Sequence, residues 1–411
     1  MRLQQISIAI IFATGLVFAF QHCSGSRSSP TFRRVLSSSH NNQISLTLPA
    51  GYTNGEVRSV ASCPSGKEYV SFRAYGTGGA ESRVYWIKGN ESGSTTLTGA
   101  NDEIRLVCVK DSTTGGDLIY ALDFTSSSIK MSTDGGRQWS QVSSGMAESD
   151  EVFMNTRGLV AELTSMNEFR ISTDFGASWT VGTSPFPSSS SRSLAISSND
   201  QGEIFVASRA WAISESTGDG FVTVRRRSME GTWSTVDTFT PDEGLNLIRV
   251  ESLDIAKSGR ILLLVMGSST TDTTAQTVFF LRKSDDNGLT WTSLTGDLLN
   301  SSTAGFITGS RLSPDGDIWY VANDGSGYRA YRSTDDGATW ISNNISAPDI
   351  LYGAAFELSS LAANKIIFAY EGQQRLRVSS PNTEGPPTSP AIPTVSSGPP
   401  YLVVKPVLVG P

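Results

Sequence analysis

One eight-residue pattern, Ser-x-Asp-x-Gly-x-x-Trp, occurs at four places in the chain and constrains its fold more than any other feature. The four copies begin at Ser132, Ser172, Ser284 and Ser333. Their starts are 40, 112 and 49 residues apart, and a shortened copy, SMEGTW, begins at Ser228 and divides the long gap equally. Repeats of roughly this length predict four-stranded units of the kind that build a β-propeller.

The pattern is typical of a tight turn between two strands. Its Asp can fold back onto backbone N–H groups, its Gly accepts a positive φ, its Ser adds a local hydrogen bond, and its Trp can pack between sheets. We therefore expect these residues to be structural rather than to bind a metal, because SDDNG and STDDG lack the later Glu of a calcium loop. The structural residues are Ser132, Asp134, Gly136, Trp139, Ser172, Asp174, Gly176, Trp179, Ser284, Asp286, Gly288, Trp291, Ser333, Asp335, Gly337 and Trp340.

The four patterns resemble the Asp-box, or BNR, repeats of sialidases and other propeller proteins. The resemblance covers roughly residues 43–385 and implies an all-β, seven-bladed β-propeller in which each box joins the third and fourth strands of a blade. Two weaker copies, KGNESGSTT from Lys88 and SSPNTEG from Ser379, complete the count of seven. Six blades are the alternative. We expect NQISLTL, residues 42–48, to close the ring by pairing with the last blade.

The amino terminus is predicted to be an export signal, residues 1–22. Residues 6–20 form an uncharged apolar run that is short for a membrane span and typical of a signal peptide. Cys23 directly follows and resembles the lipidation site of bacterial lipoproteins, which implies a membrane-anchored protein of the outer membrane or cell surface. Ordinary signal cleavage and a retained single-pass anchor are the alternatives. The Ser-rich segment 23–42 is expected to be a tether.

The other end of the chain, residues 386–411, is rich in proline and predicts an extended tail that contributes at most an edge strand. Two further cysteines, Cys63 and Cys108, fall in apolar, strand-like segments. An exported protein permits a disulfide between them, and two buried free thiols are the alternative.

Histidine usage limits the chemistry of the predicted propeller. His22 and His40 are the two histidines of the chain, and both precede it. A Ser-His-Asp triad or a His-based zinc site therefore cannot form there, and no cofactor is expected. With 32 Lys and Arg against 39 Asp and Glu, the net charge of −7 does not favour a nucleic-acid partner.

The resemblance to sialidases implies an arginine clamp on the substrate carboxylate, an Asp acid and a Tyr nucleophile. The Arg-x-Pro motif of the first clamp arginine is absent, and the paired Glu and downstream Arg are not evident. If a clamp exists, its candidates are Arg73, Arg249, Arg329 and Arg332. A polar, Arg-poor funnel at the ring centre would favour a binding module, whereas a charge-clamped pocket that holds three arginines there would favour an enzyme.

We therefore expect a non-catalytic propeller that binds a carbohydrate or protein ligand or scaffolds an envelope assembly, with a sialidase-like glycoside hydrolase as the alternative. The ligand is expected on long loops opposite the boxes, because loop tips on a rigid scaffold often carry function. The candidate ligand-binding residues are Trp211, Glu215, Asp219 and Asp272. Long loops without a function are the alternative for this region.

Overall fold

The regular structure of the described residues consists of β-strands alone. The computed structural model describes residues 44–47, 52–77, 79–88, 91–97, 104–124, 126–146, 149–164, 168–186, 194–210, 221–240, 247–268, 278–294, 306–323, 328–345, 354–358, 365–372, 375–379 and 401–408. All of them belong to one compact unit, Arg34–Pro411. Cys23 and the rest of the predicted signal and tether lie outside them. Within the described part of the chain, no helix is long and apolar enough to cross a membrane.

Six sheets have four antiparallel strands each, in the order of the sequence. The first sheet contains β2 (Tyr52–Ser62), β3 (Glu68–Gly76), β4 (Gly79–Lys88) and β5 (Glu91–Thr96). The second contains β6 (Ile104–Lys110), β7 (Asp117–Asp123), β8 (Ser128–Ser132) and β9 (Ser140–Ser143). The third contains β10 (Ser149–Met154), β11 (Val160–Thr164), β12 (Phe169–Ser172) and β13 (Thr180–Gly182).

The next three sheets repeat this arrangement. The fourth contains β14 (Leu194–Ser198), β15 (Ile204–Ala210), β16 (Phe221–Arg227) and β17 (Trp233–Phe239). The fifth contains β18 (Leu247–Ile255), β19 (Ile261–Ser268), β20 (Val278–Ser284) and β21 (Thr292–Leu294). The sixth contains β22 (Phe306–Leu312), β23 (Ile318–Asn323), β24 (Tyr328–Ser333) and β25 (Ile341–Asn344).

The remaining sheet is different, and it holds both ends of the described chain. Its strands are β26 (Ala354–Leu358), β27 (Lys365–Gly372), β28 (Arg375–Ser379), β29 (Tyr401–Leu408) and β1 (Ile44–Thr47), in the order β1-β28-β29-β27-β26. Strands β28 and β29 share one edge of β27, since β28 pairs with its Phe368–Gly372 part and β29 with Lys365–Ile367. Strand β1 pairs with both β28 and β29, so the amino-terminal segment does join the last sheet.

The all-β propeller is therefore confirmed, with six regular blades, whereas seven regular four-stranded blades are not found. In the part of the chain that the structure describes, the strand after β28 is β29, which lies between β28 and β27, and β1 from the other end of the chain adjoins β28. The expectation that the proline-rich tail contributes at most an edge strand is wrong, because β29 lies between β28 and β27. Pro406 lies opposite Ile367, at one end of the three-residue pairing between β29 and β27.

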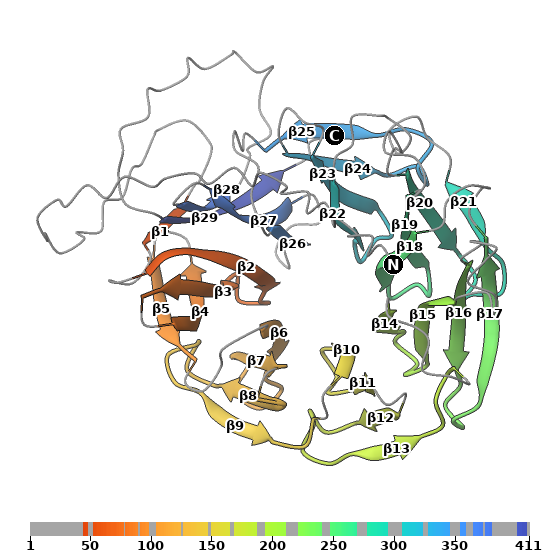
Figure 1. Cartoon of the computed structure of the whole chain (residues 1–411), viewed down its shortest axis with the longest axis horizontal. Coiled ribbons are helices and arrows are strands. Elements are labelled where there is room, and N and C mark those ends of the chain that lie inside the picture. Colours follow the sequence, from red (N-terminus) through yellow and green to blue (C-terminus); the bar gives the residue numbers. More distant parts are fainter. Residues whose placement is uncertain are drawn as a thin grey trace, which may run out of the picture. The chain divides into compact units, whose positions relative to one another are not determined.

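The first strands of the sheets contact one another in a closed series. Strand β2 contacts β6, β10 contacts β14, β14 contacts β18, β18 contacts β22, β22 contacts β26, and β26 contacts β2. Between β6 and β10 the link is a hydrogen bond from Arg105 to the backbone oxygen of Val152. The first strands therefore lie nearest the centre of the ring, and the fourth strands lie outside (Figure 1). Residues on the first strands can thus lie close to one another at the ring centre although they are far apart in the sequence.

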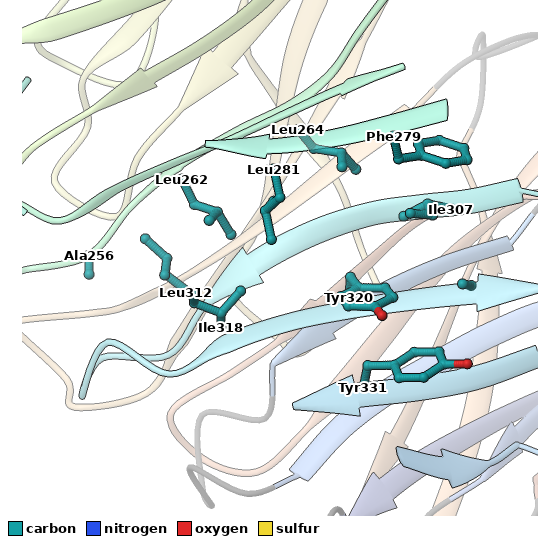
Figure 2. Close-up of a cluster of buried hydrophobic side chains, with 11 residues drawn as sticks. Ala256, Leu262, Leu264, Phe279, Leu281, Ile307, Leu312, Ile318, Tyr320 and Tyr331 are labelled. Atoms are coloured by element: carbon teal, nitrogen blue, oxygen red, sulfur yellow. The ribbon is translucent and has the colours of Figure 1, made fainter. Parts of the chain in front are cut away.

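The hydrophobic core is divided among the spaces between neighbouring sheets. One such cluster joins Leu262 and Leu264 of the fifth sheet to Ile318, Tyr320 and other residues of the sixth, as Figure 2 shows. Second strands are the most deeply buried, because strands flank them on both sides and sheets cover both faces; every residue of β11 and β23 is buried. Fourth strands such as β9 and β13 remain largely exposed.

A disulfide joins Cys63, at the end of β2, to Cys108 on β6, with 5.3 Å between the two Cα atoms. Both cysteines are buried in the cluster between the first and second sheets. Of the two alternatives left open by the sequence, the structure therefore shows the disulfide.

Candidate functional site

The repeated turns are held by their own Ser and Asp side chains. In the third sheet, the Ser172 hydroxyl donates to Asp174 Oδ1 at 2.7 Å and accepts from the backbone N–H of Gly176 at 2.7 Å. The same Asp174 oxygen accepts from the N–H of Ser178 at 2.8 Å, and Oδ2 accepts from its hydroxyl at 2.6 Å. The turns that begin at Ser132, Ser284 and Ser333 repeat the Ser–Asp and Ser–Gly bonds.

These hydrogen bonds explain the ionisation of the turn aspartates. The hydroxyl of Ser178 and its backbone N–H lower the pKa of Asp174 to about 2, and Thr290 does the same to the pKa of Asp286. Both carboxylate oxygens are engaged by the turn itself. The geometry therefore assigns these aspartates to holding the turn.

The tryptophan of each turn packs into the hydrophobic cluster shared with the preceding sheet. The four tryptophans are Trp139, Trp179, Trp291 and Trp340.

The residue before the glycine also reaches the preceding sheet. Phe175 has a φ of +58° and stacks on Tyr120 of the second sheet, with ring centroids 4.6 Å apart. Asn287 has a φ of +59° and donates to Glu203 of the fourth sheet at 2.6 Å. A left-handed conformation is unfavourable for a side chain other than glycine, so these contacts compensate for local strain.

At the turn of the sixth sheet this contact is ionic. Asp336 lies 2.7 Å from Arg260 and 3.0 Å from Lys283, both of the fifth sheet. Asp285 of the neighbouring turn lies 2.7 Å from Arg260 and 2.8 Å from Lys283. The four charges form one network between two sheets. These contacts give the turns a structural role in joining neighbouring sheets.

Two of the weaker copies of the repeated pattern have a different structure from the four clear copies. Glu91 and Gly93 lie on strand β5, opposite Lys88 and Trp86, so the first sheet has a short hairpin in place of the expected turn. The shortened copy at Ser228 closes by a bond from the Ser228 N–H to the Thr232 oxygen at 2.9 Å.

The candidate ligand-binding residues on loops, Trp211, Glu215, Asp219 and Asp272, lie outside the described residues. The candidate lipidation site Cys23 does too. Among the described residues, one group has the spacing of a metal site, namely Cys63, Cys108 and Asp117. Its two sulfur atoms are bonded to each other, so they are not available as thiolate ligands.

The four arginines considered for a clamp do not share a strand position. Arg249 lies on the first strand β18, Arg73 on the second strand β3, and Arg329 and Arg332 on the third strand β24. Arg332 is held by Asp317, with Nη2 2.6 Å from Oδ2. The clamp expected from the sialidase resemblance is therefore not assembled by these residues, because three of the four lie away from the first strands.

A different set of charged side chains meets at the centre of the ring. Arg105, Glu151, Asp254, Arg311 and Glu357 lie on the first strands β6, β10, β18, β22 and β26. We call them the ring-centre cluster. They come from five sheets and are brought together by closure of the ring, which places these strands side by side around the centre (Figure 1).

Two ion pairs within the ring-centre cluster bridge neighbouring sheets. Arg105 Nη1 lies 2.5 Å from Glu151 Oε1, and Arg311 Nε lies 3.3 Å from Glu357 Oε2. The side chains of Arg311 and Glu357 are each 33% exposed and that of Arg105 is 36% exposed, so solvent reaches them. Asp254 accepts hydrogen bonds from the backbone N–H groups of Ile255 at 3.0 Å and Leu312 at 2.6 Å.

The charges of the ring-centre cluster influence one another. Burial alone would lower the pKa of Arg311, but the nearby charges of Glu357 and Asp254 outweigh burial and raise it. Arg105, from the opposite part of the ring, acts in the other direction on the same pKa. Burial raises the pKa of Glu357, and Asp254 adds to this effect while Arg311 opposes it. Arg311 is thus paired with Glu357 and also lies within the electrostatic influence of Asp254.

Two further ion pairs lie on first strands. Arg58 pairs with Glu56 on β2, and Arg249 Nε lies 3.3 Å from Glu251 Oε1 on β18. Burial raises the pKa of Glu251, and Arg249 opposes the increase. Among the described residues, the first strands therefore carry four arginines, each paired with a carboxylate. This arrangement is neither the Arg-poor funnel nor the pocket of three clamping arginines considered from the sequence, because each of these arginines is paired with a carboxylate.

Sequence reasoning missed the ring-centre cluster because its members lie on five different strands and belong to no motif, as in IRLVCVK and FITGSRL. The available signal was the position of these charges on the first strand of each repeat. Only the closed ring shows that such isolated charges are neighbours.

Three solved structures are similar to this chain over most of its length. YCF48 bound to D1 peptide is 17% identical over 82% of this chain and 95% of that chain, with a TM-score of 0.48. The α-L-arabinofuranosidase of Fusarium graminearum in complex with an iminosugar inhibitor is 11% identical over 81% of this chain and 92% of that chain, with a TM-score of 0.45. A puromycin hydrolase complexed with PGG is 10% identical over 80% of this chain and 52% of that chain, with a TM-score of 0.50.

At these identities the likeness concerns the fold alone. No curated protein matches the chain. Residues 70–309, which are more than half of the chain, match the family described as the DUF6242 beta propeller domain. Together with the six regular blades of the structure, this match shows that the chain belongs to the DUF6242 β-propeller family.

Proposed function

We propose that this protein is an exported, surface-anchored propeller that binds a carbohydrate or protein ligand at the centre of its ring without transforming it. The observation that carries the proposal is the ring-centre cluster. It gathers charged, solvent-accessible side chains from five sheets, and convergent polar groups on a rigid scaffold are typical of binding sites. Scaffolding of an envelope assembly would use the same site for a protein partner.

The repeated turns support an assignment as Asp-box repeats. Their Ser, Asp and Gly residues make the hydrogen bonds that the pattern predicts, and their tryptophans pack between sheets. The function of these boxes is to join strands and sheets, which leaves the ring centre and the opposite loops for ligands.

Export is supported by the disulfide between Cys63 and Cys108, because such bonds persist in oxidising compartments. The apolar run at residues 6–20 and the Cys23 that follows it are consistent with a lipoprotein signal. We propose an anchor in the outer membrane or at the cell surface. Mass spectrometry of the amino-terminal peptide tests the anchor: a diacylglyceryl group on Cys23 is expected, and an unmodified cysteine would contradict it.

The pairing of the first-strand arginines supports a binding function without catalysis. Each arginine on a first strand has a carboxylate beside it, and such pairing competes with the binding of a substrate carboxylate. No histidine occurs beyond residue 40 to serve as a general base.

A glycoside hydrolase is the second candidate, and one observation favours it. Burial raises the pKa of Glu357, which suits a general acid, and Asp254 is close enough to affect it. Two carboxylates in different environments are what glycoside hydrolysis needs.

An NMR experiment on the purified full chain decides between these functions. Saturation transfer reports contact, and the anomeric protons report cleavage, when the chain is incubated with sialyllactose or with neutral oligosaccharides. Contact without new anomeric signals is expected for a glycan ligand. New anomeric signals that disappear in Glu357→Gln would contradict the proposal and establish the hydrolase. If no sugar makes contact, the binding proposal requires a protein partner bound at the ring centre. Binding of that partner with the same affinity to the wild type and to Glu357→Gln would exclude the ring centre as its site.

A further inference from the structure

The charges of the first-strand pairs nearly balance, with four arginines against five carboxylates, which limits the ligands they attract. On the first strands, Arg58, Arg105, Arg249 and Arg311 are paired with Glu56, Glu151, Glu251 and Glu357. The additional carboxylate, Asp254, is occupied by two backbone N–H groups. An anion would find no excess of positive charge here, and a cation would find only the single charge of Asp254, because each guanidinium is next to a carboxylate.

Hydrogen-bonding groups remain available in the pair of Arg311 and Glu357. Arg311 uses Nε for Glu357 and Nη1 for the backbone oxygen of Ser310 at 2.9 Å. Its Nη2 has no hydrogen-bond partner among the residues that the structure describes, although a guanidinium has five N–H donors. Beside it, Glu357 accepts one bond on each carboxylate oxygen, and each oxygen has a second lone pair. Donors and acceptors thus stand next to each other, a third exposed to solvent.

On the first strands of the described chain no large apolar side chain is exposed, and Phe153 and Ile255 are partly buried. The exposed large apolar side chains are Val181, Met229, Leu289 and Ile341. All four lie on fourth strands or in the turns that precede them, away from the ring centre. Protein partners are usually held by buried aromatic or aliphatic anchors, so this distribution argues against a polypeptide as the occupant.

We propose that the ring-centre cluster binds a neutral, polyhydroxylated saccharide, with Arg311 and Glu357 contacting neighbouring hydroxyl groups. A sugar hydroxyl both donates and accepts, and two adjacent hydroxyls match a guanidinium donor beside a carboxylate acceptor. The ligand has no net charge and therefore needs no excess charge in the site. This proposal rests on the proposed binding function and specifies its ligand class.

The test measures the affinity of the full chain for neutral hexasaccharides (cellohexaose, maltohexaose, laminarihexaose and chitohexaose) by isothermal titration calorimetry at low and high salt. The expected result is binding of at least one of them with little dependence on salt, because no charge is neutralised. Sialyllactose and a mixed acidic and basic peptide are titrated in parallel. Tighter binding of sialyllactose or of a peptide, weakened by salt, would overturn the neutral-sugar proposal.

Variants locate the site. Arg311→Lys keeps the charge but loses the planar fork, and Glu357→Gln keeps the shape but loses the charge. Each is expected to weaken hexasaccharide binding about tenfold, the loss of roughly one charge-assisted hydrogen bond. The matched control is Arg157→Lys, an arginine that is 57% exposed and paired with Asp200 in a turn of the third sheet, and it should bind like the wild type.

A misfolded variant, a wrong location of the site, a wrong ligand class and a wrong function give different results. Thermal unfolding identifies any variant that does not fold, and the salt dependence of the wild type tests the charge balance without a variant. Unchanged affinity in both folded variants would overturn the location. If no hexasaccharide binds but a peptide does, the ligand class is wrong while the binding function stands. If the anomeric protons of a hexasaccharide show cleavage, the binding function itself is wrong.

Discussion

Removal of the disulfide between Cys63 and Cys108 is the perturbation whose size the structure predicts most directly. The two cysteines are 45 residues apart in the sequence, and the bond links the first sheet to the second. In the chain-entropy description, a loop of this length restricts the unfolded chain by about 4 kcal/mol at 25 °C. Both sulfur atoms are buried, so Cys63→Ala with Cys108→Ala also leaves a small cavity, which adds to the loss.

The assay is equilibrium unfolding in guanidinium chloride, followed by tryptophan fluorescence, for the wild type and the double alanine variant under oxidising conditions. The variant is expected to lose about 4 kcal/mol of unfolding free energy, seen as a lower midpoint at a similar slope.

The wild type unfolded with a reductant present is the control. It keeps both thiols and should lose most of the same free energy. A difference below about 1 kcal/mol between oxidised and reduced wild type would refute the reasoning, because the loop would then not restrict the unfolded chain.

Three more predictions follow from the turns and from the last sheet. Gly176→Ala should lower the unfolding free energy by at least about 1–2 kcal/mol, since its φ is +88° and a Cβ would collide with the preceding sheet, whereas the control Gly182→Ala has ordinary contacts and should cost much less. Deletion of residues 386–411 removes β29 and should lower the thermal midpoint clearly; an unchanged midpoint would show that the sheet does not need this strand. Because the pKa values of Asp174 and Asp286 are lowered to about 2, their contribution to stability is present above about pH 4 and is lost as the pH falls toward 2. Unfolding midpoints measured from pH 5 to pH 2 should show this loss, and Asp286→Asn should reduce it.

The blades could be predicted from the sequence because their key signal is local. A turn such as Ser284–Trp291 contains its own hydrogen bonds, so its pattern is visible wherever it occurs. The pattern failed where the turn was replaced by a different connection, as at Glu91 and Gly93, since a few matching letters can equally well lie on a strand.

The last sheet could be predicted only in part. The pairing of residues 44–47 with the end of the chain follows from the need to cover sheet edges. The insertion of β29 between β28 and β27 did not follow, because its Pro406 argues against a central strand. In the structure β28 takes most of that edge of β27, and β29 pairs with only Lys365–Ile367.

The ring-centre cluster could not be predicted from the sequence, and the reason is geometric. Arg105 and Arg311 are far apart in the chain, and neither belongs to a motif. The charge of Arg105 affects the pKa of Arg311 only because the first strands of opposite sheets surround one centre. Of the four arginines that were candidates for a clamp, Arg73, Arg329 and Arg332 lie on second or third strands.

The central claim, that ligands bind at the ring centre, is tested most directly by hydrogen–deuterium exchange of the full chain with and without the hexasaccharide that binds best. The account predicts increased protection in peptides that contain β6, β10, β18, β22 or β26, with no change in the turns from Ser172 to Trp179 and from Ser333 to Trp340. Protection confined to those turns or to fourth strands such as β13 and β25, with the first strands unchanged, would contradict it.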